Sequence, residues 1–100
     1  MTREEAMAAL AKYRDEIDAL DLRLLALLNA RTRVVEKIGQ VKESIRLPVY
    51  EPKREDAVFA NVTSHNTGPL TPEALQRIFE RIIDEMRSLQ QMRRQGDEEC

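Results

Sequence analysis

The chain has 100 residues, enough for one small domain, and its 16 Lys and Arg residues nearly balance its 18 Asp and Glu residues, for a formal net charge of −2. This balance argues against a protein whose whole surface binds nucleic acid or an acidic membrane. A single cysteine, Cys100, excludes an internal disulfide framework and a cysteine-rich zinc site, and a single histidine, His65, leaves few groups for nucleophilic catalysis.

Residues 4–45 contain no proline, and their apolar side chains recur at alternating steps of three and four. This is the a/d pattern of a helix that is packed along its length. One seam position is taken by Arg31 instead of an apolar residue. The pattern predicts one long helix over residues 4–45, whose seam consists of Leu10, Tyr13, Ile17, Leu20, Leu24, Leu27, Val34, Ile38, Val41 and Ile45.

Two shorter helices follow. Pro48 ends the long helix, because the residue before a proline is pushed out of the α region, and Glu51-Pro52 opens a second helix with proline in its first turn. Residues 64–69 have the composition of a loop. Thr71-Pro72 opens a third helix, with threonine as its N-cap. No strand is predicted, so the fold class is all-α.

The C-terminal end is polar. After Met92 the chain has no apolar face, and we expect the third helix to fray over residues 93–99. The predicted organisation is one domain over residues 1–95 and a polar tail over residues 96–100, in which Cys100 is a free thiol.

The length of the first helix predicts an assembly. About 40 helical residues extend about 60 Å, whereas a compact monomer of this size has a radius of gyration near 13 Å. Two shorter helices cannot cover that seam, so we expect a second copy of the chain in a two-fold homodimer. An extended tail or a plain coiled coil is the alternative.

Arg31 interrupts the apolar seam. Burying a guanidinium without a partner lowers the free energy of unfolding by several kcal/mol, so its presence in the seam requires an explanation. Arg31 fixes the helix register, packs its stem in the seam while its head reaches solvent, or binds an anion. Lys42 lies on nearly the same face, about 16 Å along the axis. Arg14 is too far away to join them within one chain, but an antiparallel partner helix would bring its own Arg14 back to them. The pattern therefore permits an anion site that two chains share.

These residues carry a resemblance to the all-helical chorismate mutases, particularly to the mutase domains that accompany bacterial DAHP synthases. It extends over roughly residues 8–92. Its distinguishing feature is the spaced set of Arg, Arg, Lys, Arg-Glu and Gln rather than a single motif. The matching segments are residues 13–21, 24–31, 38–42, 48–55 and 78–90.

The resemblance implies an intertwined homodimer of three-helix chains. It implies the Claisen rearrangement of chorismate to prephenate in aromatic amino-acid biosynthesis, with no metal, no cofactor and no covalent intermediate. It also implies a complex with DAHP synthase.

The resemblance further implies roles for single residues. Arg31 and Arg14 of the partner subunit would bind substrate carboxylates. Lys42 and Gln90 would donate to the ether oxygen, which gains negative charge in the transition state. Glu55 would accept from the substrate hydroxyl and lie near Lys42.

Three further positions belong to the implied site. Arg54 would lie near the carboxylate end, and Glu51 would help to line the pocket. Met86 stands where some relatives carry a small hydroxyl residue, and a methionine cannot donate a hydrogen bond there.

Other interpretations stay open. Lys42 and Arg54 would each be read alone as surface charges, and Gln90 as part of a fraying helix end. The chain could instead be an isochorismate-pyruvate lyase, or a non-catalytic module that binds prephenate or chorismate and regulates a shikimate-pathway enzyme. Because no apolar run approaches the length of a membrane span and the first residues are acidic, we expect a cytoplasmic protein that binds neither membrane nor nucleic acid.

Overall fold

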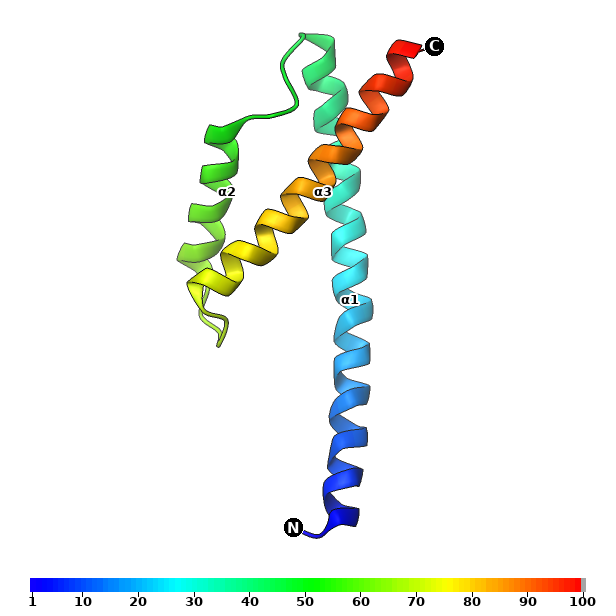
Figure 1. Cartoon of the computed structure of the whole chain (residues 1–100), viewed down its shortest axis with the longest axis vertical. Coiled ribbons are helices and arrows are strands. Elements are labelled where there is room, and N and C mark those ends of the chain that lie inside the picture. The colour runs from blue at the N-terminus through cyan, green and yellow to red at the C-terminus, as the bar shows by residue number, and fades with distance from the viewer. Residues whose placement is uncertain (100) are drawn as a thin grey trace. The chain divides into compact units, whose positions relative to one another are not determined.

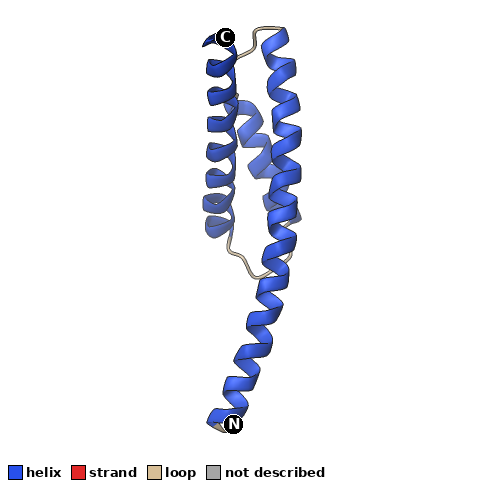
Figure 2. Ribbon diagram, turned by 90° about the vertical axis from the view of Figure 1, so that its right-hand side faces the viewer, coloured by secondary structure: helices blue, strands red, loops and turns tan. Residues whose placement is uncertain are grey.

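The computed structural model describes the backbone of residues 1–99 and the side chains of residues 1–96. It divides into two compact units, residues 1–34 (unit 1) and residues 35 onward (unit 2). Over residues 1–99 the chain forms three helices and no strand (Figure 2). The predicted all-α class with one long and two shorter helices is therefore confirmed for a single chain.

Helix α1 spans Arg3–Ser44, close to the predicted range. Its start is a capping box, because the Glu5 N–H donates to Thr2 Oγ1 at 3.1 Å while the Thr2 hydroxyl donates to the Glu5 carboxylate at 3.1 Å. Glu4 and Glu5 also stabilise the positive end of the helix. The T-x-x-E spacing of this capping box is visible in the sequence.

The end of α1 is set by the backbone as well as by Pro48. The Leu47 N–H donates to the Lys42 carbonyl at 2.8 Å, and the Arg46 N–H donates to the Glu43 carbonyl at 3.1 Å. These are the two hydrogen bonds of a Schellman motif, and Arg46 takes the left-handed position with φ 58° that glycine usually fills. The chain then enters the extended segment before α2.

Helix α2 spans Pro52–His65 and helix α3 spans Pro72–Glu99. Both prolines occupy the predicted first turns, and Thr71 Oγ1 caps α3 by accepting from the Ala74 N–H at 3.1 Å. The predicted start of the loop at residue 64 is wrong by two residues, because α2 continues through His65.

The expected fraying after Met92 is also wrong, because α3 continues to Glu99. Arg93 pairs with Glu36 at 3.0 Å, and Arg94 donates to the Leu47 carbonyl at 2.9 Å. These two contacts hold the polar end of α3 against α1 and against the segment that follows α1. A hydropathy pattern cannot predict them, because they join polar groups far apart in the sequence. Cys100 lies outside the described residues, and the division at residue 95 stays a prediction.

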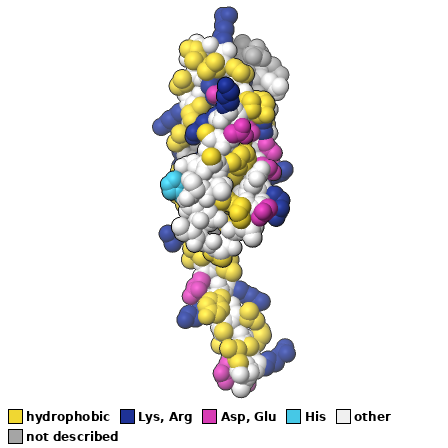
Figure 3. All heavy atoms as spheres, turned by 90° about the vertical axis from the view of Figure 1, so that its left-hand side faces the viewer, with side chains coloured by type: hydrophobic (Ala, Val, Ile, Leu, Met, Phe, Trp, Pro, Cys, Tyr) yellow, Lys and Arg dark blue, Asp and Glu magenta, His cyan; other side chains and the backbone are white. Residues whose placement is uncertain are grey.

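In unit 2, α2 and α3 pack against each other (Figure 1), and the buried apolar core of the described residues comes from α3 alone: Leu75, Ile83 and Met86. In unit 1 no described side chain is buried, and apolar side chains reach the surface along the helix (Figure 3). Leu27, in the middle of the seam, is 68% exposed. Among the described helices, none is both long enough and apolar enough to cross a membrane.

Candidate active site

Lys42, in the last turn of α1, is held by the segment that leads into α2. Its Nζ lies 2.7 Å from Glu51 Oε1 and donates to the Val49 carbonyl at 2.9 Å, and its side chain is 12% exposed. Glu51 is the N-cap residue of α2, yet its side chain makes no capping hydrogen bond. Its carboxylate is turned to Lys42 instead. An ammonium has three N–H donors, so these two contacts leave one donor for a ligand.

A second acid–base pair joins α2 to α3. Arg87 Nη1 lies 3.3 Å from Glu55 Oε2, and the two side chains are 25% and 22% exposed. The Arg87 guanidinium also pairs with Asp84 of its own helix and lies 4.8 Å from the centroid of the Tyr50 ring. Glu55 was expected near Lys42; the structure pairs Glu55 with Arg87 and Lys42 with Glu51.

Gln90 extends from α3 to the backbone of α1. Its Nε2 donates to the Val35 carbonyl at 2.7 Å, which leaves the second N–H of the amide for another acceptor. Val35 precedes Lys42 by two helical turns, so the amide meets α1 on the Lys42 face, about 10 Å along the axis. Lys42 and Gln90 thus each keep a hydrogen-bond donor on the same part of unit 2.

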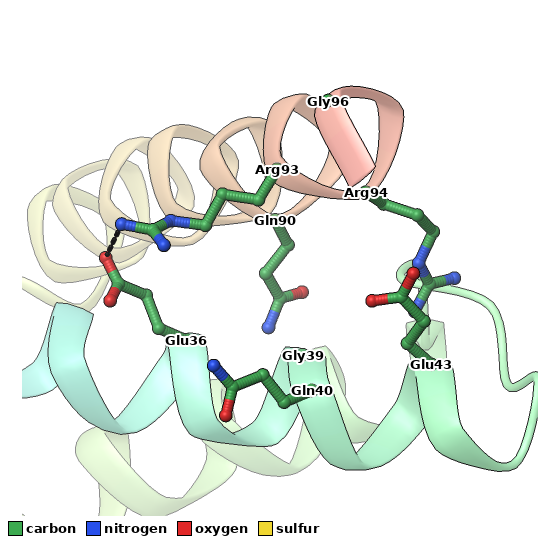
Figure 4. Close-up of a pocket in the computed structure, with 8 residues that line it drawn as sticks. All are labelled: Glu36, Gly39, Gln40, Glu43, Gln90, Arg93, Arg94 and Gly96. Atoms are coloured by element: carbon green, nitrogen blue, oxygen red, sulfur yellow. Dashed lines mark ion pairs between the residues drawn. The ribbon is translucent and has the colours of Figure 1, made fainter. Parts of the chain in front are cut away.

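A hollow of about 500 Å³ lies beside Gln90, between α1 and the end of α3. Figure 4 shows Gln90 pointing toward α1 and the ion pair between Arg93 and Glu36 at one side of the hollow. Of the predicted site residues, Gln90 lines this hollow among the described residues, and Lys42 does not. The lining residues are Glu36, Gly39, Gln40, Glu43, Gln90, Arg93, Arg94 and Gly96.

The other predicted residues are distributed over both units. In unit 2, Arg54 is exposed on α2, and Met86 is 6% exposed in the apolar core. In unit 1, Arg14 is exposed and Arg31 is half-buried. Unit 2 therefore contains Lys42 with Glu51, Glu55 with Arg87, and Gln90. The roles of these and of the other predicted site residues stay predictions.

Arg87 is the residue that the sequence reasoning missed. It stands three positions before Gln90 on α3, and residues at this spacing share a helix face. That spacing is the signal that would have placed a further cation beside Gln90. The pairing of Arg87 with Glu55 has no such signal in the sequence, because it depends on how α2 and α3 pack.

Known proteins are similar to this chain in sequence. The family model for chorismate mutase type II matches residues 13–91. The bifunctional chorismate mutase/prephenate dehydratase of Aquifex aeolicus is 35% identical over 88 residues, which are 84% of this chain and 24% of that protein. The chain thus spans about a quarter of the length of this relative.

Solved structures agree in fold. The chorismate mutase of Thermus thermophilus (form II) superimposes with a TM-score of 0.81 at 32% identity, over 83% of this chain and 94% of that one. The chorismate mutase of Helicobacter pylori, solved in complex with prephenate, has a TM-score of 0.79 at 31% identity, over 84% of this chain and 91% of that one. The chain belongs to the chorismate mutase type II family.

Proposed function

We propose that this chain is a chorismate mutase that converts chorismate to prephenate, and that Lys42 and Gln90 act on the ether oxygen of the substrate. The observation that carries the proposal is the pair of remaining donors. Lys42 has one N–H left after its contacts with Glu51 and Val49, and Gln90 has one left after its contact with Val35. Membership of the family supports the same reaction.

The chemistry suits these groups. In a Claisen rearrangement one C–O bond breaks while one C–C bond forms within the same molecule, so every atom is conserved and no proton leaves or enters. The breaking C–O bond places negative charge on the ether oxygen. Two fixed donors aimed at that oxygen bind the transition state more strongly than the substrate, and holding the flexible substrate in its reactive conformer supplies the rest.

The substrate carries two carboxylates, whereas the Lys42–Glu51 and Arg87–Glu55 pairs each already match a cation with a carboxylate of this chain. We assign the carboxylates to Arg31, to Arg54 and to Arg14 of the partner subunit on the family resemblance and because a planar guanidinium matches a carboxylate with two hydrogen bonds. Glu55, which its ion pair with Arg87 holds in place, accepts a hydrogen bond from the substrate hydroxyl. Glu51 and Met86 complete the proposed lining, Met86 by contact alone.

A homodimer is part of this proposal. No described side chain of α1 is buried, although apolar residues recur along its seam. A contiguous exposed apolar surface of this kind marks a protein–protein interface. The exposed seam of α1, with Leu20 at 56% and Leu24 at 53%, supplies the apolar surface. An intertwined arrangement would bring Arg14 of one chain to the site of the other.

Two further expectations concern the setting of the enzyme. The resemblance to mutase domains that accompany DAHP synthases supports a complex with that enzyme in the cytoplasm. The Aquifex relative, by its name, joins its mutase to a prephenate dehydratase instead. To decide between these partners, kcat/KM for chorismate is measured with saturating DAHP synthase and, separately, with saturating prephenate dehydratase. We expect the partner enzyme to raise kcat/KM and the other enzyme to leave it unchanged.

The test of the reaction is the loss of chorismate absorbance with purified protein. We expect stoichiometric formation of prephenate at a rate far above the buffer control. Pyruvate release from isochorismate as the dominant activity would assign the lyase reaction instead. Binding of prephenate without turnover of either substrate would assign a regulatory module.

A further inference from the structure

Gly39 stands inside α1, where a glycine costs roughly 1 kcal/mol of helix stability relative to alanine. Its φ is not positive, so the backbone of this position does not require glycine. The reason for glycine therefore lies in its surroundings and not in its own conformation.

Those surroundings are the side chain of Gln90. A Cβ added at residue 39 would lie 3.3 Å from Gln90 Cγ, 3.4 Å from Nε2 and 3.5 Å from Cδ. The first of these distances is shorter than ordinary carbon–carbon contact, which begins near 3.5 Å. Because Gln90 can rotate and α1 cannot, an added Cβ would displace the amide by a few tenths of an ångström.

The geometry of the helix explains why the amide is the part that moves. In an α-helix the Cα–Cβ bond points toward the N-terminus, so a Cβ at residue 39 is directed at the preceding turn. That turn contains the Val35 carbonyl, which Gln90 Nε2 reaches at 2.7 Å. Gln90 thus lies in the space that the missing Cβ leaves open.

We infer that Gly39 is a positioning residue for catalysis: the absence of its side chain lets Gln90 lie flat against α1 and anchor one amide N–H on Val35, with the other directed at the substrate. This inference rests on the proposed function and deepens it, because it adds a residue that acts through Gln90 without touching the substrate. The glycine at position 39 lowers the stability of α1 but allows this placement of the Gln90 amide.

The chain offers a control away from the site. Gly68 lies in the loop between α2 and α3, its φ is not positive, and a Cβ added there would meet only Asn66 Oδ1, at 3.9 Å. Gly39→Ala improves helix propensity and Gly68→Ala adds a methyl group without strain, so neither is expected to lower the Tm at equal protomer concentration. We expect Gly39→Ala to lower kcat about tenfold with little change in KM, and Gly68→Ala to leave both unchanged. Equal kcat values for the two variants would overturn the inference.

A double-mutant cycle separates positioning from a general structural effect. If Gly39 acts through Gln90, then Gly39→Ala in a Gln90→Ala background lowers kcat no further. A tenfold further loss in that background would show that Gly39 acts by another route and would contradict the inference.

The position of Gln90 can also be read without any substrate. The side-chain amide resonances of Gln90, assigned by their loss in Gln90→Glu, should shift in Gly39→Ala and stay in place in Gly68→Ala. Unmoved resonances in Gly39→Ala would overturn the inference. Failure of the wild-type protein to convert chorismate overturns the proposed function, and the two failures are therefore distinguishable.

Discussion

Arg87 of α3 and Glu55 of α2 form an ion pair across two helices, with Nη1 and Oε2 3.3 Å apart and both side chains about three-quarters buried. The pair ties together the only elements whose packing supplies a buried core among the described residues. It also fixes the carboxylate to which the proposed mechanism assigns the substrate hydroxyl.

Arg87→Met should therefore destabilise the protein, because it leaves the Glu55 carboxylate largely buried without its partner. We expect the free energy of unfolding in urea to fall by about 1–2 kcal/mol. Arg81→Met is the control, since the Arg81–Glu85 pair on the same helix is exposed and such pairs contribute less than about 0.5 kcal/mol. Adding Glu55→Gln to Arg87→Met should recover part of the loss; no recovery would deny the coupling.

Lys42→Met tests the proposed donor on α1. Methionine keeps the length of the largely buried stem and removes every N–H, so kcat should fall by about 10²–10³. Lys37→Met removes an exposed lysine from the same helix and should leave kcat unchanged. Steady-state assays of both variants with chorismate check the prediction, and equal activities would remove Lys42 from the mechanism.

Gln90→Glu tests the second donor through pH. A neutral amide donates at any ordinary pH, whereas an ionised carboxylate only accepts. The variant needs its protonated form, so its kcat should rise relative to wild type as the pH falls toward the ordinary glutamate pKa of about 4.3. Gln91→Glu, one residue on and exposed, should follow the wild-type profile. Parallel profiles for Gln90→Glu and wild type would exclude the role.

Much of the fold could be predicted because its signals are local. Pro52, Thr71 and Pro72 mark helix starts in the sequence, and the heptad pattern gives α1 its length. The end of α3 could not be predicted in this way. Its polar residues are held by Glu36 and by the Leu47 carbonyl, which lie 57 and 47 positions away in the sequence.

For the candidate site, too, the sequence predicts the residues but not the contacts between them. The family resemblance predicts Lys42, Glu51, Glu55 and Gln90 as site residues, but the residues with which they pair depend on packing between helices. Glu51 is in the position of a helix cap and pairs with Lys42 instead. Arg87 with Glu55, and Gly39 with Gln90, likewise depend on how α3 lies against its neighbours in unit 2.

Arg46 offers a prediction about stability alone. It takes a left-handed conformation, φ 58°, at the end of α1, where a residue with a Cβ is strained by about 1 kcal/mol. Arg46→Gly should raise the free energy of unfolding by about 0.5–1 kcal/mol, and Arg46→Val should lower it. Urea unfolding of the three proteins checks this order, and a destabilised glycine variant would contradict the role of the motif.

The central claim is a mutase whose active site takes Arg14 from a second chain, and mixed dimers test it most directly. Arg14→Ala and Lys42→Met are each expected to be nearly inactive alone. Unfolded together and refolded at equal concentrations, they should regain about a quarter of the wild-type chorismate mutase activity, because half of the dimers are mixed and each mixed dimer has one intact site. Activity no greater than that of the two separate variants would contradict the shared site.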